Sequence, residues 1–470
     1  MSSAPKPIGP AGKVFRDPVH GLIRIESGDD FVRDLINTPE FQRLRRVRQL
    51  GVSSFTYPGA EHTRFAHSLG VFNFAQRILD MLRRRYAEAR EVQELLTAQQ
   101  RTVKAAALLH DVGHGPFSHM IERAFEAVAD HEKKTVAIIQ DGGAITDCLV
   151  RHGLDPKAVA NLVRKASEHR FLVDVVSSQL DADRMDYVLR DALNTGVKYG
   201  AYDSEWVLNS LCLGGEPGLK DAPGLRDLRL CLEEKRGLFS AEQLVMARMH
   251  MSYQVYYHKA TRGWEAHLLC LLKLAAEAAK ADALPPATPA NVRRFLSGEG
   301  VLKGDDWLWF DESAVEAALH AWAMAGQSNA ELGELSRAFL LRQKTFRCAE
   351  LGNWTTEQAL RLSMGLGRAG RDGIDWLLDD PKFTSYKDFD SGFRGAMKSR
   401  DQAAVSTSAI LISDGGLESI ARPAESVSLV LDALGERPAG NRTTLARLYY
   451  HHKVAGPVEK ALAEVGLTGK

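Results

Sequence analysis

The chain is organised around one stretch, Lys104-Ala-Ala-Ala-Leu-Leu-His110-Asp111-Val-Gly-His114-Gly-Pro-Phe-Ser-His119-Met-Ile-Glu122. It places three histidines and two acidic residues directly after an apolar run. The run has the i, i+3, i+4 and i+7 spacing of one helix face at Val103, Ala106, Ala107 and His110. This spacing predicts that His110 faces the core, either as a hydrogen-bonded core residue or as a metal ligand. A lone histidine favours the core interpretation, but its partners along the rest of the chain favour a metal ligand.

The composition restricts the class of protein. With 470 residues, the chain is longer than one ordinary domain, and we predict two. Its 60 Lys and Arg residues balance its 60 Asp and Glu residues, which argues against general nucleic-acid binding and against attraction to an anionic membrane. No Walker loop and no G-x-G-x-x-G fingerprint precedes a predicted helix, so nucleotide binding by those routes is not indicated.

Cysteine usage and the N-terminus predict the cellular compartment. The five cysteines show no C-x-x-C spacing, which is typical of a reduced intracellular protein. Residues 1–6 lack the apolar segment of a signal peptide, and no apolar run approaches the length of a membrane span. We therefore predict a soluble, cytoplasmic protein without a membrane partner.

Local signals predict a mainly α fold with little β structure. Residues 13–26 have the pattern of a small N-terminal β-hairpin. Thr38-Pro39-Glu40 is a typical helix start, and Gly51 is the expected end of that helix. Residues 71–109 are predicted to be helical throughout, and Asp130 is expected to cap the helix that follows it.

The proline-rich segment 281–289 is the predicted domain boundary. Beyond it we predict mostly helix over residues 290–400, strands at 404–412 and 445–450, and a closing helix at 457–465. The resulting division is a flexible lead-in at 1–12, a catalytic core at 13–280, a linker at 281–289, and a helical plus α+β region at 290–470.

Two further stretches carry polar residues at helical spacing. Asp183, Tyr187 and Asp191 recur at i, i+4 and i+8 in an otherwise apolar segment, which favours a site lining over a solvated face. Arg248, Ser252, Tyr256 and Lys259 repeat the pattern, although such a stripe taken alone is more often an amphipathic surface.

Four residues could together hold a divalent cation: His67, His110, Asp111 and Asp183. Two imidazoles and two carboxylates form a mixed nitrogen and oxygen site that suits Fe, Mn, Zn, Co or Ni without distinguishing among them. Such a cation lowers the pKa of bound water from about 15.7 toward about 7 and so provides a hydroxide nucleophile at neutral pH.

The residues around these four suit phosphate chemistry. Arg64 lies one helical turn before His67, and Arg184 follows Asp183 directly, so both can contact phosphate oxygens. His114 and His119 can stabilise charge or donate a proton to the leaving oxygen. Glu122 is three residues past His119 and can hold that imidazole and raise its pKa.

With these motifs in place, the chain resembles the HD-domain phosphohydrolases, and within them the deoxynucleoside triphosphate triphosphohydrolases. The resemblance extends from Lys13 to about Lys259 and fades beyond residue 262. It rests on residues 15–21, 38–51, 58–70, 110–119, 131–132 and 181–191.

The resemblance implies a role for each matching position. It assigns the metal to the four residues chosen above. It assigns catalysis to His114, His119, Glu122 and His131, with His119 as the proton donor. It assigns phosphate and nucleotide contacts to Arg64, Arg184, Tyr187 and Arg248, and deoxyribose contacts to Gln49, Leu50, Asp191 and Tyr256. In this scheme Gln49 and Asp191 bond the 3′-hydroxyl, while Leu50 and Tyr256 leave no room for a 2′-hydroxyl.

Some positions depart from the vertebrate SAM- and HD-domain member of that family. Glu122 replaces an aspartate, and Asn37 replaces the acid that reads guanine at the effector site of that enzyme. An amide offers one acceptor and a competing donor where a carboxylate accepts two N–H groups, so guanine-specific activation is in question. The positions that form an effector or subunit contact in this comparison are Arg16, Asn37, Gln42, Arg45 and Lys259.

The sequence thus predicts a mainly α HD-domain core with a small N-terminal hairpin and a C-terminal helical plus α+β region. The predicted activity is hydrolysis of dNTPs to deoxynucleoside and inorganic triphosphate, with Mg or Mn accompanying the substrate phosphates. The expected assembly is an allosteric homo-oligomer (dimer, tetramer or hexamer) with a nucleotide effector. The alternatives are a phosphohydrolase that releases phosphate or pyrophosphate stepwise, and a nucleotide-sensing or nucleic-acid-binding module with a weakly active HD site.

Overall fold

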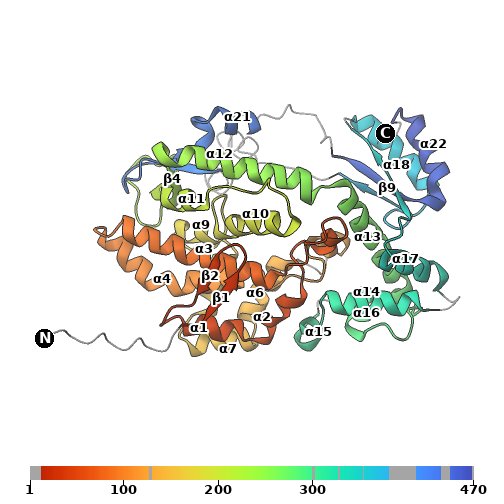
Figure 1. Ribbon diagram of the computed structural model, residues 1–470, viewed down its shortest axis with the longest axis horizontal. Helices are drawn as coiled ribbons and strands as arrows, with labels where there is room; N and C mark the ends of the chain where they lie inside the picture. The colour runs from red at the N-terminus through yellow and green to blue at the C-terminus, as the bar shows by residue number, and fades with distance from the viewer. Residues whose placement is uncertain are drawn as a thin grey trace.

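The computed structural model describes residues 12–125, 130–298, 302–325, 329–352, 354–380, 409–435 and 445–467. It has the predicted fold class: a helical body with a small N-terminal hairpin and a C-terminal α+β part (Figure 1). The helices of the first part are α1 (Asp30–Ile36), α2 (Pro39–Arg43), α3 (Arg64–Arg85), α4 (Arg90–Leu109), α5 (His119–Ala124), α6 (His131–Gln140), α7 (Ala144–Arg151), α8 (Pro156–Val163), α9 (Arg170–Val176), α10 (Ala182–Thr195), α11 (Ser204–Ser210), α12 (Glu234–Met251) and α13 (Lys259–Lys280).

The later helices have at most 14 residues each among the described residues. They are α14 (Ala290–Ser297), α15 (Gly304–Leu308), α16 (Glu312–Ala323), α17 (Ala330–Leu340), α18 (Thr356–Ala369), α21 (Leu429–Gly435) and α22 (Ala455–Glu464). Among the described residues, none of the helices combines the length and the apolar content needed to cross a bilayer. The five cysteines are free, and four of them are buried.

Within the predicted catalytic core at 13–280, which we call the catalytic body, the long helices α3 and α4 lie side by side (Figure 1). Val103, Ala106 and Ala107 on α4 are fully buried, which confirms the predicted core-facing stripe. His110 is the C-cap residue of α4. Its imidazole and the following Asp111 therefore lie at the C-terminal end of the buried stripe.

Residues 71–109 are not one continuous helix, so that prediction was wrong in one detail. The chain leaves the helix between Arg85 and Arg90. At the break the Tyr86 side chain is buried, and its hydroxyl accepts a hydrogen bond from the backbone N–H of Leu213 at 2.7 Å. This is a tertiary contact with a distant segment. The break could not be predicted from the sequence, because residues 86–89 include no helix-breaking residue.

The helix that starts at Pro39 ends earlier than predicted. It stops at Arg43, continues as a 3₁₀ turn over Leu44–Arg46, and becomes extended at Val47. Arg48 then forms an isolated β-bridge with Thr63. The extended course carries the next two residues, Gln49 and Leu50, to a cavity that a continued helix would not have reached.

Three small sheets complete the fold. The hairpin pairs β1 (Val14–Asp17) with β2 (Gly21–Arg24), as predicted. A four-stranded sheet has the order β3 (Leu211–Gly215), β4 (Leu228–Glu233), β7 (Leu411–Ser413) and β8 (Arg422–Pro423). A three-stranded sheet has the order β5 (Phe346–Glu350), β9 (Arg447–His451) and β6 (Trp376–Asp379).

The C-terminal strands match the prediction in part. The strand predicted at 404–412 is β7, which begins at Leu411, and residues 404–408 lie outside the described part of the chain. The strand predicted at 445–450 is β9, and the closing helix is α22. The prediction missed β5 and β6, which interrupt the stretch that was expected to be mostly helical.

Apolar packing continues across the predicted domain boundary. Residues 281–289 contain neither helix nor strand and join α13 to α14. However, one hydrophobic cluster combines Val52 and Phe117 from the first part of the chain with Trp307 and Leu319 from the second. Strand β7 likewise pairs in parallel with β4 of the catalytic body. The division at 281–289 stays a prediction.

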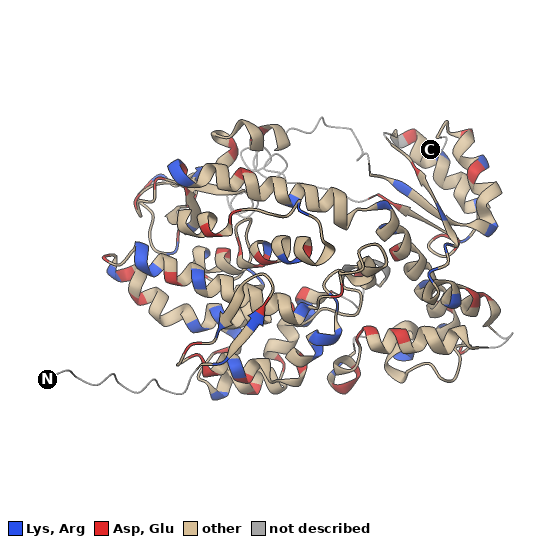
Figure 2. Ribbon diagram, viewed as in Figure 1, with Lys and Arg blue, Asp and Glu red and all other residues tan. Residues whose placement is uncertain are grey.

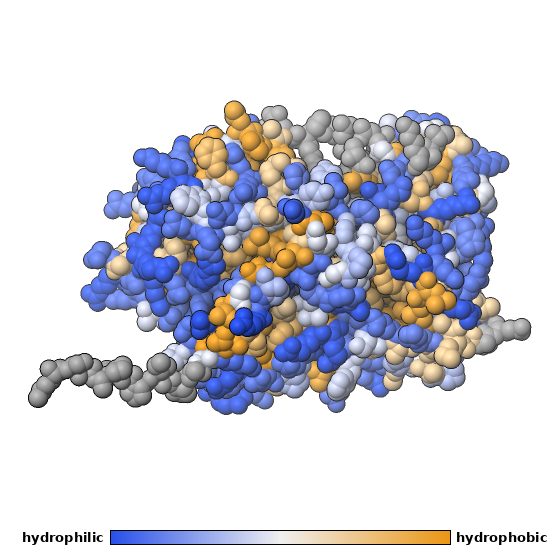
Figure 3. All heavy atoms as spheres, in the orientation of Figure 1, coloured by the Kyte–Doolittle hydropathy of each residue, from blue (hydrophilic) through white to orange (hydrophobic). Residues whose placement is uncertain are grey.

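The surface carries charges of both signs. Figure 2 shows Lys and Arg interspersed with Asp and Glu over the helices, in keeping with the balanced composition. Figure 3 shows hydrophobic residues in several separate places on one face. One of these places is over α21, where Leu429 and Val430 are exposed.

Candidate active site and metal centre

Three helices bring the four predicted metal ligands together. His67 lies in the second turn of α3, His110 and Asp111 follow α4, and Asp183 is in the first turn of α10. Helix α10 begins at this place because Asp181 caps it: its carboxylate accepts a hydrogen bond from the backbone N–H of Arg184 at 2.7 Å.

The ligand atoms converge. Nε2 of His67 lies 3.1 Å from Oδ1 of Asp183 and 3.8 Å from Oδ2 of Asp111. Nε2 of His110 lies 3.5 Å from Oδ1 of Asp111 and 3.8 Å from Oδ1 of Asp183. Both of these imidazole nitrogens are buried and have no hydrogen bond of proper geometry among the described residues. Two unsatisfied imidazole nitrogens that face two carboxylates fit a divalent cation.

The electrostatics of the cluster favour positive charge. Burial lowers the pKa of the His67 imidazole, but the carboxylates of Asp183 and Asp186 outweigh burial and raise the pKa to about 10. Burial raises the pKa of the Asp183 carboxyl, but His67 and His110 outweigh it and lower the pKa to about 2. Both shifts have one cause: the site concentrates carboxylate charge around its imidazoles.

Asp186 anchors the predicted metal ligand His67, and the sequence analysis did not identify it. Its fully buried carboxylate accepts from Nδ1 of His67 and from Nε2 of His20, both within 2.8 Å. Arg190 donates to it from the same helix and pairs with Asp17 of the hairpin at 2.8 Å. The spacing of Asp186 and Arg190 at i and i+4 on a helix that carries a metal ligand was the available signal.

A glycine makes room for this anchor. A Cβ atom added to Gly70 on α3 would lie 1.9 Å from Oδ1 of Asp186 and 2.5 Å from Nη2 of Arg190. Helices α3 and α10 can therefore approach closely enough for Asp186 to reach His67 only where position 70 carries no side chain.

Two predicted catalytic histidines stack on each other beside the four predicted metal ligands. The rings of His114 and His131 are 3.9 Å apart, and Nδ1 of His131 donates to Oε1 of Glu122 at 2.5 Å. Glu122 was expected to hold His119, whose side chain lies outside the described part of the structure. Asp111, His114 and His131 form a second group whose potential ligand atoms lie within 4.8 Å of one another.

The pKa values of the two stacked imidazoles are shifted in opposite directions. Burial, together with the nearby Arg64 guanidinium, holds the pKa of His114 well below its ordinary value. Burial lowers the pKa of His131, but its hydrogen bond to Glu122 outweighs burial and raises the pKa. Two neighbouring titratable groups whose environments move their pKa values apart are the arrangement that acid–base chemistry uses.

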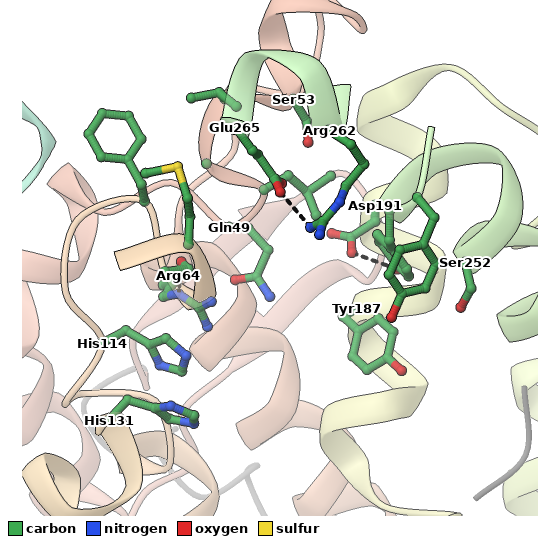
Figure 4. Close-up of a pocket in the computed structure, with 18 of the residues that line it drawn as sticks. Gln49, Ser53, Arg64, His114, His131, Tyr187, Asp191, Ser252, Arg262 and Glu265 are labelled. Carbon is green, nitrogen blue, oxygen red and sulfur yellow. Dashed lines mark hydrogen bonds and ion pairs between the residues drawn. The ribbon is translucent and has the colours of Figure 1, made fainter. Parts of the chain in front are cut away.

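A cavity of about 930 Å³ opens onto these groups. Figure 4 shows Arg64, His114 and His131 on one side of it, Tyr187, Asp191 and Ser252 on the other, and Arg262 paired with Glu265 at its far end. The predicted site residues that line the cavity are Gln49, Leu50, Arg64, Asp111, His114, His131, Asp183, Tyr187, Asp191, Arg248 and Tyr256.

Asp191 is the centre of the predicted sugar site. Its carboxylate accepts from the Tyr256 hydroxyl at 2.9 Å and from Nε2 of His62 at 2.8 Å. His62 was not predicted, because nothing in its local spacing links it to α10. Oε1 of Gln49 is buried and has no hydrogen-bond partner among the described residues.

The three predicted phosphate-binding arginines differ in their contacts. Arg64 donates to the Oδ2 atom of Asp111 and to the Ser118 hydroxyl, so it contacts a predicted metal ligand. Arg184 pairs with the capping Asp181, and it is not among the residues that line the cavity. Arg248 lines the cavity and donates to Oε1 of Gln179 at 2.8 Å.

The predicted effector residues lie apart from the cavity. Arg16, Asn37 and Arg45 are exposed, and Gln42 accepts a hydrogen bond from Arg45 at 2.9 Å. Lys259 pairs with Glu350 at 2.8 Å. It also lines a second cavity of about 430 Å³ whose walls include Trp264, Phe346, Lys344 and Tyr449.

Comparisons with known proteins agree with this geometry. The family model for the HD domain matches residues 64–191, the span that carries all four predicted metal ligands. The chain is 34% identical over 441 residues to YwfO of Bacillus subtilis, an uncharacterized protein, with 93% of this chain and 92% of YwfO covered. A crystal structure described as a phosphohydrolase from Bacteroides thetaiotaomicron superposes with a TM-score of 0.67 at 25% identity, covering 94% of this chain and 100% of that one.

The chain belongs to the HD-domain phosphohydrolase superfamily. Members of this superfamily bind divalent metals, and the His and Asp residues described above could hold one in this phosphohydrolase. The phosphohydrolase is also 31% identical to the deoxynucleoside triphosphate triphosphohydrolase SAMHD1 of Bos taurus. That match covers 40% of this chain and 36% of SAMHD1.

Proposed function

We propose that this phosphohydrolase hydrolyses deoxynucleoside triphosphates to deoxynucleoside and inorganic triphosphate. The observation that carries the proposal is the single cavity that joins the metal cluster to the site formed by Asp191, Tyr256 and Gln49. Its volume of about 930 Å³ is in the range of cavities that enclose a ligand of nucleotide size. The partial similarity to SAMHD1 supports the same substrate class.

The proposed reaction breaks the bond between the α-phosphorus and the 5′ oxygen of the sugar. A divalent cation held by His67, His110, Asp111 and Asp183 would supply hydroxide at neutral pH by lowering the pKa of water. Arg64 is beside Asp111 and neutralises charge on the phosphate oxygens. The oxygen of the hydroxide would form a bond to the α-phosphorus and become part of the departing triphosphate. The 5′ oxygen takes up a proton from His119, the donor that the resemblance assigns, or from His131, which is held by Glu122.

The deoxyribose end of the cavity would select against ribonucleotides. In the proposed pose, Leu50 and Tyr256 close the space that a 2′-hydroxyl needs, and Tyr256 is fixed there by its hydrogen bond to Asp191. We expect Leu50→Ala to narrow the preference for dNTP over rNTP by about tenfold, since excluding a small group by contact is worth about 1–3 kcal/mol. The measurement is kcat/KM for a matched dNTP and rNTP. An unchanged ratio would remove Leu50 from the sugar site.

The products test the proposed function directly. Purified protein is incubated with each dNTP and rNTP, singly and mixed, with Mg²⁺ or Mn²⁺, and the products are separated by anion-exchange chromatography. Deoxynucleoside and inorganic triphosphate in equal amounts are the expected result. Orthophosphate or pyrophosphate would support stepwise phosphate removal instead. The mixed incubations also test the proposed nucleotide effector, because one nucleotide would then accelerate hydrolysis of another.

Assembly and effector binding belong to the same proposal. We propose a homo-oligomer in which Arg16, Asn37, Gln42, Arg45 and Lys259 contribute effector or subunit contacts. Lys259 is the member of this set that lines a cavity of its own, together with Lys344 and aromatic residues. Cations and aromatic rings are the groups that bind a nucleotide phosphate and base.

A further inference from the structure

The segment formed by α15 and the start of α16 reaches from the C-terminal half of the chain to the loop that carries His114. We call residues 304–316 the α15–α16 segment and residues 111–118 the catalytic loop. Two fully or almost fully buried charged side chains join them, Glu312 and Arg43. Neither was assigned a role in the proposed reaction, and a buried charge needs compensating contacts.

Glu312 lies in the first turn of α16 and is 3% exposed. Its Oε1 atom accepts a hydrogen bond from the backbone N–H of Phe117 at 2.9 Å. Both of its carboxylate oxygens lie within 3.1 Å of the backbone N–H of Arg48. One side chain therefore ties the catalytic loop to the chain segment that leads into Gln49 and Leu50 of the cavity.

Arg43 makes a parallel connection. Its Nη1 atom donates to the carbonyl oxygen of His114 at 2.7 Å, and its Nε atom donates to the carbonyl oxygen of Trp307 at 3.0 Å. A third bond runs from Nη2 to the carbonyl oxygen of Phe310. The guanidinium thus holds the backbone of a catalytic histidine against two turns of the α15–α16 segment.

The backbone of the catalytic loop needs this support. Phe117 and Ser118 both have positive φ values, 55° and 50°, which non-glycine residues rarely adopt. Such conformations cost about 1–3 kcal/mol each and persist only where surrounding contacts determine them. The Phe117 N–H is bonded to Glu312, and the Ser118 hydroxyl receives a hydrogen bond from Arg64 at 3.0 Å.

We propose that Glu312 is a positioning residue: it holds the catalytic loop in its strained conformation and so places His114, Ser118 and Arg64 for reaction. This inference rests on the proposed function only for its kinetic consequence. Its structural part is independent of the substrate. The geometry also means that the α15–α16 segment supports the catalytic loop, although none of the four predicted metal ligands lies in that segment.

The test compares three variants of the full-length protein: Glu312→Ala, Glu312→Gln and Glu316→Ala. Glu316 is the matched control, because it lies one turn later on α16 and pairs with the Arg48 side chain at 2.8 Å without touching the loop backbone. The Gln variant keeps a carbonyl oxygen that can still accept from the Phe117 N–H.

Hydrogen exchange of peptides across residues 111–118 is the first readout. In Glu312→Ala we expect the Phe117 amide to exchange about tenfold faster, the upper end of what loss of a single hydrogen bond produces. The peptides of α4 and the bound-metal content should not change. We expect Glu312→Gln to be intermediate and Glu316→Ala to match the wild type.

Kinetics is the second readout. Glu312→Ala should lower kcat about 10²-fold with little change in KM, since a misplacement of about 1 Å has effects of that size. Glu312→Gln should recover most of the loss. The proposal would be overturned if the Phe117 amide of Glu312→Ala exchanges at the same rate as in the wild type. It would also be overturned if exchange in this variant becomes faster throughout the protein, or if the variant loses its metal. If Glu312→Ala does not fold, the Phe117 amide decides. Protection in the wild type that is partly lost in Glu312→Gln supports the proposal. An unprotected Phe117 amide in the wild type, or protection that Glu312→Gln leaves unchanged, overturns it. If the wild type fails to hydrolyse dNTPs, the exchange experiment still decides the positioning role.

Discussion

Replacing Asp183 with alanine is expected to remove the bound metal and the activity together. Asp183 is the predicted metal ligand on α10, and its Oδ1 atom lies 3.1 Å from Nε2 of His67 and 3.8 Å from Nε2 of His110. Turnover should fall by roughly 10³-fold or more, because without the cation water keeps its ordinary pKa. The measurements are metal content per chain and initial rates with dNTP.

Glu205→Ala is the matched control for this variant. Glu205 is an acidic residue in the first turn of the neighbouring helix α11, and its side chain is 74% exposed. It pairs with Arg77 at the surface, where removing one partner costs little. We expect this variant to keep its metal and its rate. Full metal content and full turnover in Asp183→Ala would exclude Asp183 as a ligand.

Replacing Arg190 with methionine is expected to destabilise the whole catalytic body. Arg190 is fully buried between the carboxylates of Asp186 and Asp17. Its removal leaves two buried carboxylates without their main partner, a change that costs about 3–5 kcal/mol. Because Asp186 also orients His67, the variant should bind metal more weakly. Chemical denaturation and metal titration measure the two effects.

Arg90→Met is the control, because Arg90 and Glu94 form the same type of helical pair at i and i+4 with both side chains largely exposed. That pair is worth about 0–1 kcal/mol.

The pH dependence of the stability loss in Arg190→Met gives a further check. Burial raises the pKa of Asp186, but Arg190, His20 and His67 hold it well below its ordinary value. Without Arg190 the pKa rises, so the carboxyl can take up a proton as the pH falls. The loss of stability relative to wild type should therefore be larger at pH 8 than at pH 5. An equal loss at both pH values would contradict this account.

Much of the candidate site could be predicted from the sequence because its residues lie at helical spacings within short motifs. His110 and Asp111 follow a buried stripe of α4, and Asp183, Tyr187 and Asp191 lie on one face of α10. The contacts that orient these residues could not be predicted in the same way. His62 meets Asp191, and Glu312 meets Phe117, across separations that no local pattern reports.

The same distinction between local preferences and distant contacts separates the parts of the fold that could be predicted from those that could not. The hairpin, the central helices and the cap at Asp130 depend on local preferences, and the structure agrees with them. The predicted helix from Pro39 to Gly51 failed because the extended course at Val47 and Arg48 is fixed by a β-bridge to Thr63 and by Glu312. Strands β5 and β6 were missed because their partner, β9, is far along the chain.

The parallel pairing of β7 with β4 has a consequence for how the protein is made. Leu232 and Ile412 are register partners, so β4 is completed by a segment that is synthesised long after β4 itself. Contacts between residues so far apart in the chain form slowly, and an edge strand without its neighbour can pair with other nascent chains. Until β7 pairs with it, this edge of β4 is open, and chains truncated before β7 should require chaperones to stay in solution.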